Sequence, residues 1–233
     1  KSAGNGVDPL EIIDKYSADA LRLWMSFIGD YFESVNWSED GVRACKKFIN
    51  RVVNLQDILV DGDTVSESNM NRQFIHAGKM GSSKAESAAE WVSKLYPDCK
   101  VDIFSKYLGL DDSELISDAD VVVDCLDSSE DRVMLGHMCI KEGKVLVHAA
   151  VDAYHGQVAV IRPEDVLRMD HIYPRPSKGG VHHAISTAVT FIGSLEANEV
   201  INVLIGSEHS LRDEILSVDL NDYSMSRYRI GSS

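Results

Sequence analysis

The string ILVDGD, at residues 58–63, sets the architecture expected for most of this chain. Its three branched apolar side chains predict a short strand, and the acidic turn that follows marks where this strand ends. In open α/β sheets, a carboxylate at the carboxyl end of a parallel strand can accept hydrogen bonds from ribose hydroxyls. Asp61 is therefore a candidate nucleotide-binding residue. The alternative is an ordinary Asp-Gly turn, because aspartate and glycine are frequent in turns.

Beyond this string, the sequence pattern alternates between strands and helices. The predicted strands are residues 100–104, 120–125, 144–151, 157–162, 214–220 and 223–230. The predicted helices are residues 82–95, 128–142 and 184–205. The last helix is apolar on most sides, so we expect it to be buried. This alternation predicts an α/β layered domain.

Before the string, the sequence is helical in character. Asp8 followed by Pro9 is a helix cap with a favoured first-turn proline, and Ser38 with acidic residues behind it marks another helix start. Residues 1–58 carry 7 basic and 9 acidic side chains, whereas residues 59–233 carry 16 and 28. The change in periodicity and in charge predicts two parts, a helical segment at 1–58 and an α/β domain at 59–233.

Composition excludes several classes of protein. The 233 residues are 44% hydrophobic and 26% charged, as in an ordinary globular protein. A net charge of −14 argues against a broad DNA-binding surface and makes tRNA binding unlikely to be a function of this chain. The four cysteines form no C-x-x-C pair, which favours a reducing, cytoplasmic environment. No apolar run reaches the roughly 18 residues of a membrane span, so we expect no membrane partner.

Two cations follow the acidic turn. Arg72 belongs to the polar string SNMNRQ at residues 68–73, and Lys84 opens the next predicted helix. A fork-shaped guanidinium and a point charge together could neutralise a triphosphate. The alternative is that both are surface residues.

Asp124 and Asp127 flank Cys125 at the end of a β-branched strand. One of them could hold Mg²⁺, which prefers one or two carboxylates together with substrate phosphates. The alternative for Asp127 is capping of the helix predicted from residue 128. Cys125 and Cys139 have apolar surroundings in sequence, so we expect inert core thiols. A metal site at the histidines is not expected, because adjacent histidines on one helix face different directions; these histidines are His171, His182 and His183.

Four strings in the second part resemble the ThiF, MoeB and HesA family, relatives of ubiquitin-activating enzymes. They are VDGDTV at 60–65, SNMNRQ at 68–73, DCLD at 124–127 and GSLEA at 193–197. The resemblance implies a Rossmann-like, mostly parallel sheet with flanking helices. It also implies a homodimer that uses MgATP to adenylylate the C-terminal glycine of a ubiquitin-like sulfur-carrier protein.

The resemblance assigns roles to six residues. It implies that Asp61 holds the ribose and that Asp127 binds Mg²⁺. It implies that four residues surround the phosphates, namely Asn69, Arg72, Gln73 and Lys84. Within this set, Arg72, Lys84 and Asp127 are the expected catalytic residues, because cations and a metal must offset the repulsion between a carboxylate and an α-phosphate.

The first part resembles another ATP-using family. The strings KSAGNGVDP at 1–9 and DKYSADALR at 14–22 resemble the region after the K-M-S-K-S loop of class I aminoacyl-tRNA synthetases. The string WSEDGV at 37–42 points to the leucyl enzyme. The H-I-G-H motif is absent from the sequence, so we do not expect synthetase activity.

The chain also departs from the ThiF-like pattern. That family begins with a strand and a glycine-rich turn whose amides cradle the nucleotide, whereas here residues 42–56 form a charged amphipathic helix. We therefore expect adenylylation to be impaired, and we expect unpaired edges on the strands that would flank the absent one. The simplest interpretation is a chimera joined near residues 55–62. The alternative functions are a non-catalytic ThiF-like binding module and a leucyl-tRNA synthetase fragment.

Overall fold

The computed structural model describes residues 7–27, 37–53, 56–177 and 184–230. The chain divides into two compact units, one formed by Lys1–Asp57 with Val92–Asp102 and the other by Ile58–Trp91 with Ile103–Ser233. The domain division predicted at residues 58 and 59 remains a prediction.

Three helices make up most of the first unit, and these are α1 (Pro9–Tyr16), α2 (Ala18–Phe27) and α3 (Glu39–Val53). The predicted caps are confirmed: Asp8 accepts a hydrogen bond from the amide of Leu10 at 2.9 Å, and the Ser38 hydroxyl accepts one from the amide of Gly41 at 3.1 Å. The helices share a small apolar core, which contains Ile12, Tyr16, Ala20, Val42 and Cys45.

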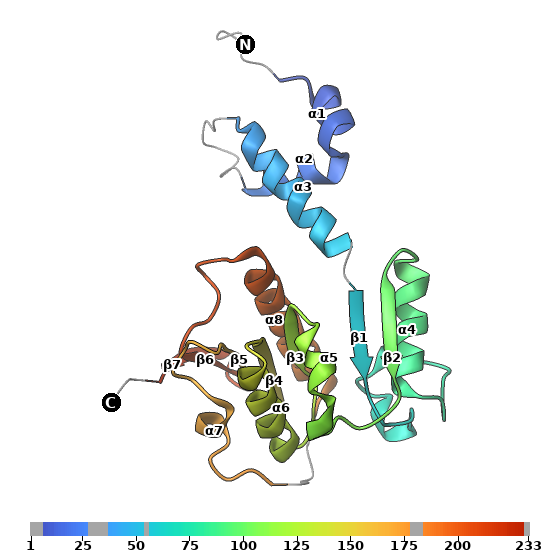
Figure 1. Cartoon of the computed structure of the whole chain (residues 1–233), viewed down its shortest axis with the longest axis vertical. Helices are drawn as coiled ribbons and strands as arrows, with labels where there is room; N and C mark the ends of the chain where they lie inside the picture. The colour runs from blue at the N-terminus through green and yellow to red at the C-terminus, as the bar shows by residue number, and fades with distance from the viewer. Residues whose placement is uncertain (1–6, 28–36, 54–55, 178–183, 231–233) are drawn as a thin grey trace. The chain divides into compact units, whose positions relative to one another are not determined.

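A two-stranded sheet follows, formed by β1 (Gln56–Val60) and β2 (Lys100–Phe104) (Figure 1). The amide of Asp61 donates to the carbonyl of Phe104 at 3.2 Å, so the carboxyl ends of the two strands lie together and the strands are parallel. Between them the chain forms two 3-10 turns, η1 (Glu67–Asn69) and η2 (Phe74–His76), and the helix α4 (Lys84–Leu95).

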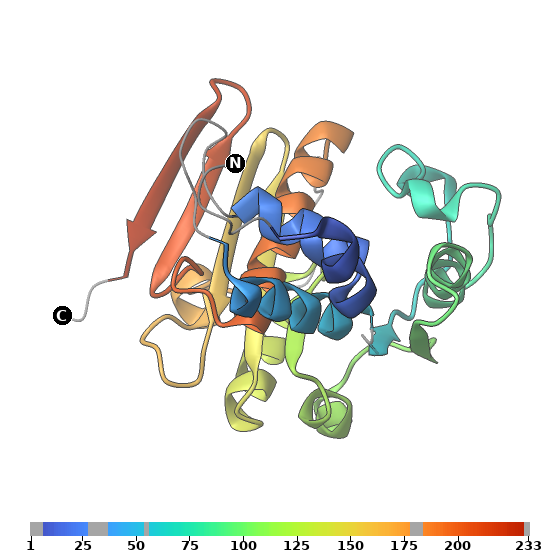
Figure 2. The ribbon, with the colours of Figure 1, turned by 90° about the horizontal axis from the view of Figure 1, so that it is seen from above.

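A second sheet has five strands, in the order β3-β4-β5-β6-β7. These strands are β3 (Val121–Asp124), β4 (Val145–Asp152), β5 (His155–Ile161), β6 (Glu214–Asp219) and β7 (Ser224–Arg229). The β3–β4 pair is parallel and the other pairs are antiparallel. Figure 2 shows β6 and β7 as the hairpin that closes one edge. The predicted α/β fold is confirmed, but this sheet is mixed and not mostly parallel, because three of its four strand pairs are antiparallel.

Each face of this sheet carries its own apolar core. The helix α6 (Ser129–Lys141) shares a core with Leu146 and Ile161, while α8 (Ser186–Ile205) shares one with Val147 and Val160. Because neighbouring strand residues point to opposite faces, the two helices cover opposite sides. Three short helices complete the fold, namely η3 (Leu110–Asp112), α5 (Ser113–Ser117) and α7 (Met169–Ile172).

The helix α8 is less buried than its composition predicts. Ala188 and Ile192 pack against the sheet, but Phe191, Ile201 and Ile205 are exposed on the outer side. Among the described helices, α8 is the one that is long and apolar enough to cross a membrane by length and composition. Its contacts with β3, β4 and β5 are those of a helix that covers a sheet. The absence of a membrane partner therefore remains a prediction.

Among the described strands, β1 and β3 are edge strands, as are β2 and β7 at the other ends of the two sheets. Within the described residues, β1 pairs only with β2, and β3 pairs only with β4. The element that precedes β1 in this part of the chain is α3, and no glycine-rich strand stands before it. The free edges of β1 and β3 are those expected when a strand is absent from the middle of a parallel sheet.

Candidate functional site

The acidic turn after β1 is held by its own side chains. The Oδ1 atom of Asp61 accepts a hydrogen bond from the amide of Asp63 at 2.7 Å, which is the geometry of an Asx turn. Asp61 is half-buried, and its described hydrogen bond uses Oδ1. The turn interpretation and the ribose interpretation are therefore compatible in this structure.

Lys84 lies at this turn, but its charge already has a partner. Its Nζ atom donates to Oδ2 of Asp63 at 2.7 Å, and its amide donates to the carbonyl of Asp63 at 3.0 Å. The hydroxyl of Tyr107 donates to Oδ1 of the same carboxylate at 2.8 Å. The hydrogen bond from Lys84, followed by that from Tyr107, lowers the pKa of Asp63. Asp63 therefore stays charged and offsets the lysine.

The polar string after the turn is folded onto itself. Arg72 donates from Nη1 to the carbonyl of Ser68 at 3.1 Å and to Oδ1 of Asn71 at 2.9 Å. Asn69 accepts at its Oδ1 atom from the hydroxyl of Ser66 at 2.7 Å, and Oε1 of Gln73 is buried without a hydrogen-bond partner. Asn69, Arg72 and Gln73 thus lie in one segment of the chain. Within it, the guanidinium of Arg72 is bound to Ser68 and Asn71 and not to a ligand site.

The two aspartates at the end of β3 differ in burial. Asp124 is buried, and its carboxylate contacts Nδ1 of His148 at 2.6 Å and the amide of Leu126 at 3.0 Å. Asp124 therefore does not offer a free oxygen to Mg²⁺ in this structure, because both of its carboxylate oxygens already have partners inside the fold. Asp127 is exposed, and the α6 helix is capped instead by the residue after it, so the capping alternative for Asp127 is also wrong.

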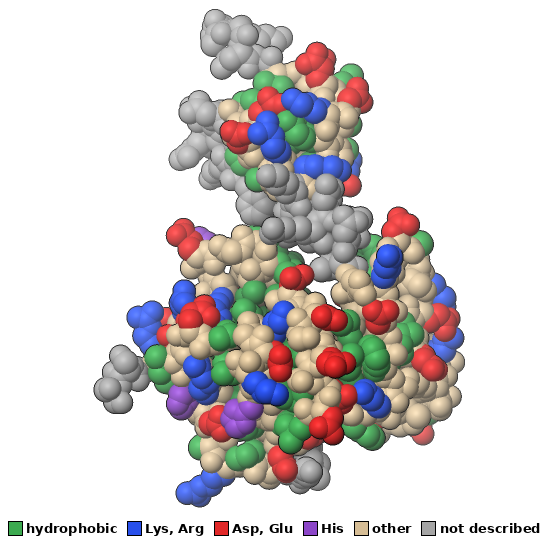
Figure 3. All heavy atoms as spheres, in the orientation of Figure 1, with side chains coloured by type: hydrophobic (Ala, Val, Ile, Leu, Met, Phe, Trp, Pro, Cys, Tyr) green, Lys and Arg blue, Asp and Glu red, His purple; other side chains and the backbone are tan. Residues whose placement is uncertain are grey.

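Electrostatics connect Asp127 to the acidic turn. The pKa of Tyr107 is raised, chiefly by its hydrogen bond to Asp63, and the charges of Asp61 and Asp127 add to the rise. Both carboxylates therefore act on the same hydroxyl. Figure 3 shows several acidic side chains together on one face of the second unit, with single basic side chains between them. Among the residues that the structure describes, no group of three possible metal ligands is found.

A buried polar network lies beneath the β3 turn, and sequence reasoning missed it. Arg132 donates from Nε to the carbonyl of Leu126 at 3.0 Å and from Nη1 to the hydroxyl of Tyr173 at 2.7 Å. Gln157 lies 3.2 Å from Nε2 of His148 and from the hydroxyl of Tyr173. The network fixes the turn that leads to Asp127. A signal was present, because His148 and Gln157 are polar residues within otherwise apolar strands.

Glu196 and Cys125 lie beside this network. Oε1 of Glu196 is buried without a hydrogen-bond partner, and burial, followed by the charge of Asp124, raises its pKa to about 8. Burial, followed by the charge of Glu196, raises the pKa of Cys125 to about 12. Cys125 nevertheless keeps an exposed surface, so its expected place in the core is wrong, whereas Cys139 is buried as predicted. Both thiols stay protonated at neutral pH.

Of the three histidines considered for a metal site, only His171 lies in the described part of the chain. His182 and His183 lie outside the described residues. His171 accepts a hydrogen bond at Nδ1 from the amide of Arg168 at 3.0 Å. His171 therefore has a structural partner within its own turn.

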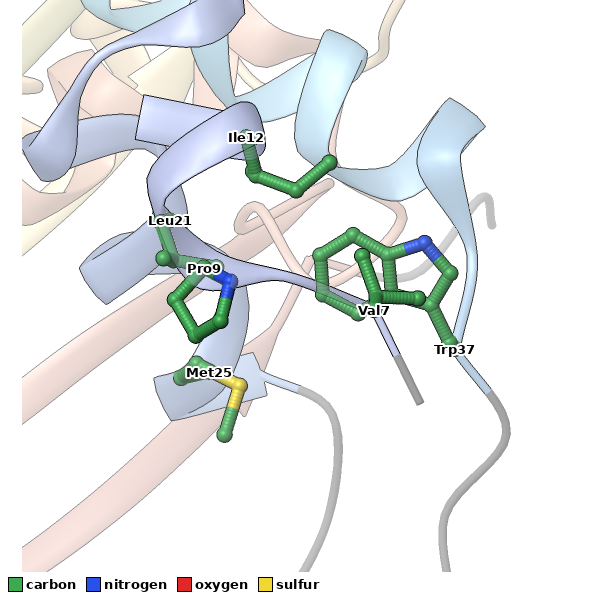
Figure 4. A pocket seen from close by; sticks show the side chains of 6 residues that line it. All are labelled: Val7, Pro9, Ile12, Leu21, Met25 and Trp37. Carbon is green, nitrogen blue, oxygen red and sulfur yellow. The ribbon is translucent and has the colours of Figure 1, made fainter. Parts of the chain in front are cut away.

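The first unit contains an apolar hollow of about 380 Å³. Figure 4 shows its lining side chains, which are Val7, Pro9, Ile12, Leu21, Met25 and Trp37. None of them can donate or accept a proton in the pH range of enzymes. This hollow therefore supplies no catalytic group.

The fold and the site together define a class of protein. Its members have an α/β domain with a partly parallel sheet, and charged turns follow the carboxyl ends of the parallel strands. Residues 56–233 match the model of the ThiF family. The chain therefore belongs to the ThiF family, as its sequence strings indicated. Residues 1–38 separately match the model for class I tRNA synthetases of the isoleucine, leucine, methionine and valine group.

Individual relatives agree with this division. The SAMP-activating enzyme E1 of Haloferax volcanii is 31% identical over 172 residues, which are 71% of this chain and 64% of that protein. The leucine–tRNA ligase of Alkaliphilus oremlandii is 45% identical over 67 residues, which are 29% of this chain and 8% of that protein. This chain thus spans less than two thirds of either relative.

Solved structures show the same fold. The crystal structure of E. coli MccB with ATP superposes with a TM-score of 0.70 at 13% sequence identity, covering 91% of this chain and 77% of that one. At this identity the likeness shows the fold alone.

Proposed function

We propose that this chain adenylylates the C-terminal carboxylate of a ubiquitin-like sulfur-carrier protein, using MgATP, with slow turnover. Membership of the ThiF family supports the proposal, as does similarity to an enzyme named for activating SAMP. The observation that carries it is the meeting of Asp61, Lys84 and Tyr107 at one turn, within electrostatic reach of Asp127.

The chemistry requires one bond to form and one to break. A carboxylate oxygen of the carrier attacks the α-phosphorus of ATP, and the bond to the β-phosphate oxygen breaks, so pyrophosphate leaves. Asp61 binds the ribose through its carboxylate, and Lys84 shifts from Asp63 to the phosphates. The exposed carboxylate of Asp127 suits Mg²⁺, a hard cation that prefers oxygen ligands. When bound, Mg²⁺ supplies positive charge that offsets the repulsion between the two anions.

Slow turnover follows from the resting contacts. Lys84 must leave Asp63, and Arg72 must leave its own turn, before either reaches a phosphate. Within the described residues, no glycine-rich turn precedes β1 to donate backbone amides to the nucleotide. Each of these features weakens ATP binding, and the displaced contacts must also stay broken while the α-phosphate reacts, so adenylylation is slow.

Carrier-dependent exchange between ATP and pyrophosphate tests the proposal. We expect weak exchange with the intact chain and a loss of at least tenfold in Asp127→Ala. Asp118→Ala, on another exposed carboxylate, is the matched control and should leave the exchange unchanged. Exchange that persists at the same rate in Asp127→Ala would remove the metal-binding role from this residue.

A second candidate is a binding module that holds the carrier without forming an adenylate. The Lys84–Asp63 pair favours it, because the lysine charge is already offset in the resting protein. Calorimetry separates the two candidates. Micromolar ATP binding would count against the non-catalytic module, whereas carrier binding without ATP binding would support it.

We further propose a homodimer in the cytoplasm. All four cysteines are free thiols, as a reducing compartment requires. Light scattering of the purified chain tests the dimer, and a monomer across the micromolar range would contradict it. Fractionation of the source cells tests the compartment.

A further inference from the structure

The backbone of Leu126, just beyond β3, is held at both of its polar atoms. Its amide donates to Oδ1 of Asp124 at 3.0 Å. Its carbonyl accepts from Nε of Arg132 at 3.0 Å and also from Nη2 of the same guanidinium. Two donors of one planar group fix the direction of an oxygen more closely than a single donor does. Because Asp127 is the next residue, this clamp fixes the backbone from which its side chain leaves.

Regular elements support both halves of the clamp. Asp124 ends β3, and its Oδ2 atom lies 2.6 Å from Nδ1 of His148, its register partner on β4. Arg132 belongs to α6, and its Nη1 atom donates to the hydroxyl of Tyr173 at 2.7 Å. The side chain of Asp124 is 0% exposed and that of Arg132 is 12% exposed. Water therefore competes little for these hydrogen bonds.

Asp127 differs from every member of the clamp. It is exposed, and in the described part of the chain it makes no hydrogen bond or ion pair. Ordering such a side chain on a cation costs conformational entropy. In metal sites, partners behind the ligands often supply this order in advance, and their loss weakens metal binding by about 10- to 100-fold. Arg132 is placed to do this for Asp127 through the backbone.

We propose that Arg132 is a positioning residue for a divalent cation at Asp127, and that it acts by holding the carbonyl of Leu126. This inference rests on the proposed function for the nature of the ligand, which is Mg²⁺. It goes further by naming the residue that orders the metal-binding carboxylate, although Arg132 itself does not touch the metal.

Arg132 also has a structural role that the test must separate. Its guanidinium lies 3.9 Å from Oδ2 of Asp124, so it balances a buried negative charge. An uncharged residue in its place would leave that charge unpaired and would destabilise the fold. Arg132→Lys keeps the positive charge, but a single ammonium group cannot reproduce the guanidinium fork. This variant therefore changes the hold on the turn and retains the charge balance.

Arg162 provides a matched control. It donates from Nη1 to the carbonyl of Leu211 at 2.6 Å and from Nη2 to the hydroxyl of Ser210 at 2.7 Å. Its side chain is 13% exposed and lies 3.6 Å from Oδ2 of the buried Asp165. Arg162 follows β5, and the strand registers place that end of the sheet beside the start of β3, away from Asp127. Arg162→Lys therefore repeats the chemical change without touching the turn.

Paramagnetic broadening by Mn²⁺ tests the proposal in the full chain, without ATP or carrier. Mn²⁺ takes the same oxygen ligands as Mg²⁺ and broadens the NMR signals of nearby amides. We expect Mn²⁺ to broaden the amide signals of residues 126–129, and Asp127→Ala to abolish this effect. Arg132→Lys should raise the Mn²⁺ concentration for half-broadening at least tenfold, whereas Arg162→Lys should leave it unchanged. A purely structural role would lower the Tm but would not change the metal affinity of the folded protein.

Two further measurements accompany the titration. Hydrogen exchange at the amide of Leu126 should be faster in Arg132→Lys than in the parent chain, and unchanged in Arg162→Lys. Tyr173→Phe removes only the hydroxyl that accepts from Arg132, so it should raise the Mn²⁺ concentration for half-broadening at least threefold. This second variant decides the question if Arg132→Lys does not fold, which its Tm reports.

The outcomes separate this inference from the proposed function. If Asp127→Ala abolishes the broadening but Arg132→Lys and Tyr173→Phe match the parent chain, the positioning role is overturned and the metal-binding role of Asp127 stands. Broadening that persists in Asp127→Ala would overturn both roles. An equal loss of affinity in Arg132→Lys and Arg162→Lys would also overturn the positioning role, because the effect would then not depend on the turn.

Discussion

The ion pair between Lys84 and Asp63 limits which ligands can recruit the lysine. The lysine lies where a phosphate ligand is expected, but a carboxylate that follows two residues after Asp61 holds it at 2.7 Å. The pair is partly buried, so it is less screened by solvent than a surface pair. A ligand that recruits Lys84 must therefore bring enough negative charge to compete with Asp63.

Glu196 predicts a pH dependence of stability. Its pKa is raised from 4.5 in the unfolded chain to about 8 in the fold, chiefly by burial. The folded state thus holds a proton that the unfolded state has lost between these values. The contribution of Glu196 is fully present below pH 4.5 and is lost as the pH rises through about 8, with a slope of at most about 1.4 kcal/mol per pH unit.

Urea unfolding across this pH window measures the effect. Glu196→Gln keeps the shape of the side chain but cannot lose a proton, so the part of the pH dependence due to Glu196 should disappear. Glu208→Gln, on an exposed side chain, should retain the dependence of the parent chain. Identical pH profiles for the parent and Glu196→Gln would contradict the raised pKa.

The residues of the site were only partly predictable from sequence. The positions of Asp61 after a strand and of Lys84 at a helix start were predictable, because strand ends and helix starts can be located from local pattern. Tyr107 and His148 were not, because their importance comes from partners 44 and 24 residues away along the chain. A polar residue within an apolar strand indicates only that a partner is needed, and it does not identify that partner.

At the scale of elements, the contact between α8 and β5 depends on a glycine. A Cβ atom at Gly156 would lie 2.2 Å from Cγ1 of Ile192, closer than real atoms approach. We expect Gly156→Ala to lower the free energy of unfolding by about 1–3 kcal/mol, as overpacking does elsewhere. Urea denaturation of the parent chain and of Gly156→Ala measures this difference in the free energy of unfolding.

A second glycine is the matched control. Gly193 lies on α8 itself, and a Cβ atom there would meet nothing within 4 Å. Gly193→Ala should therefore stabilise the protein by up to about 1 kcal/mol, because alanine favours a helix interior more than glycine does. If both variants change stability by the same amount and sign, close packing is not the reason for Gly156.

The elements themselves were largely predictable, because each carries a local apolar period. The predicted strand at 100–104 coincides with β2, and the helix predicted at 128–142 contains α6. The burial of α8 was not predictable from composition. An apolar helix indicates that a partner surface exists, but how much of the helix that surface covers depends on the rest of the fold.

At the scale of the whole molecule, net charge predicts weak attraction to nucleic acid. The chain carries 37 acidic and 23 basic side chains, so few phosphates could be neutralised. We expect no shift of leucine tRNA in a native gel at low ionic strength. A shift that disappears with added salt would contradict this expectation and favour the synthetase-fragment alternative.

The five-stranded sheet has one further consequence, which concerns the order of events during synthesis. Its spatial order, β3-β4-β5-β6-β7, is also the order in which its strands leave the ribosome. Each new strand therefore meets a neighbour that has already emerged, and the tight connections from β4 to β5 and from β6 to β7 make those two contacts fast. We expect this sheet to grow by successive addition, so that the valine edge of β3 is the first to emerge and is still uncovered when the last strand docks.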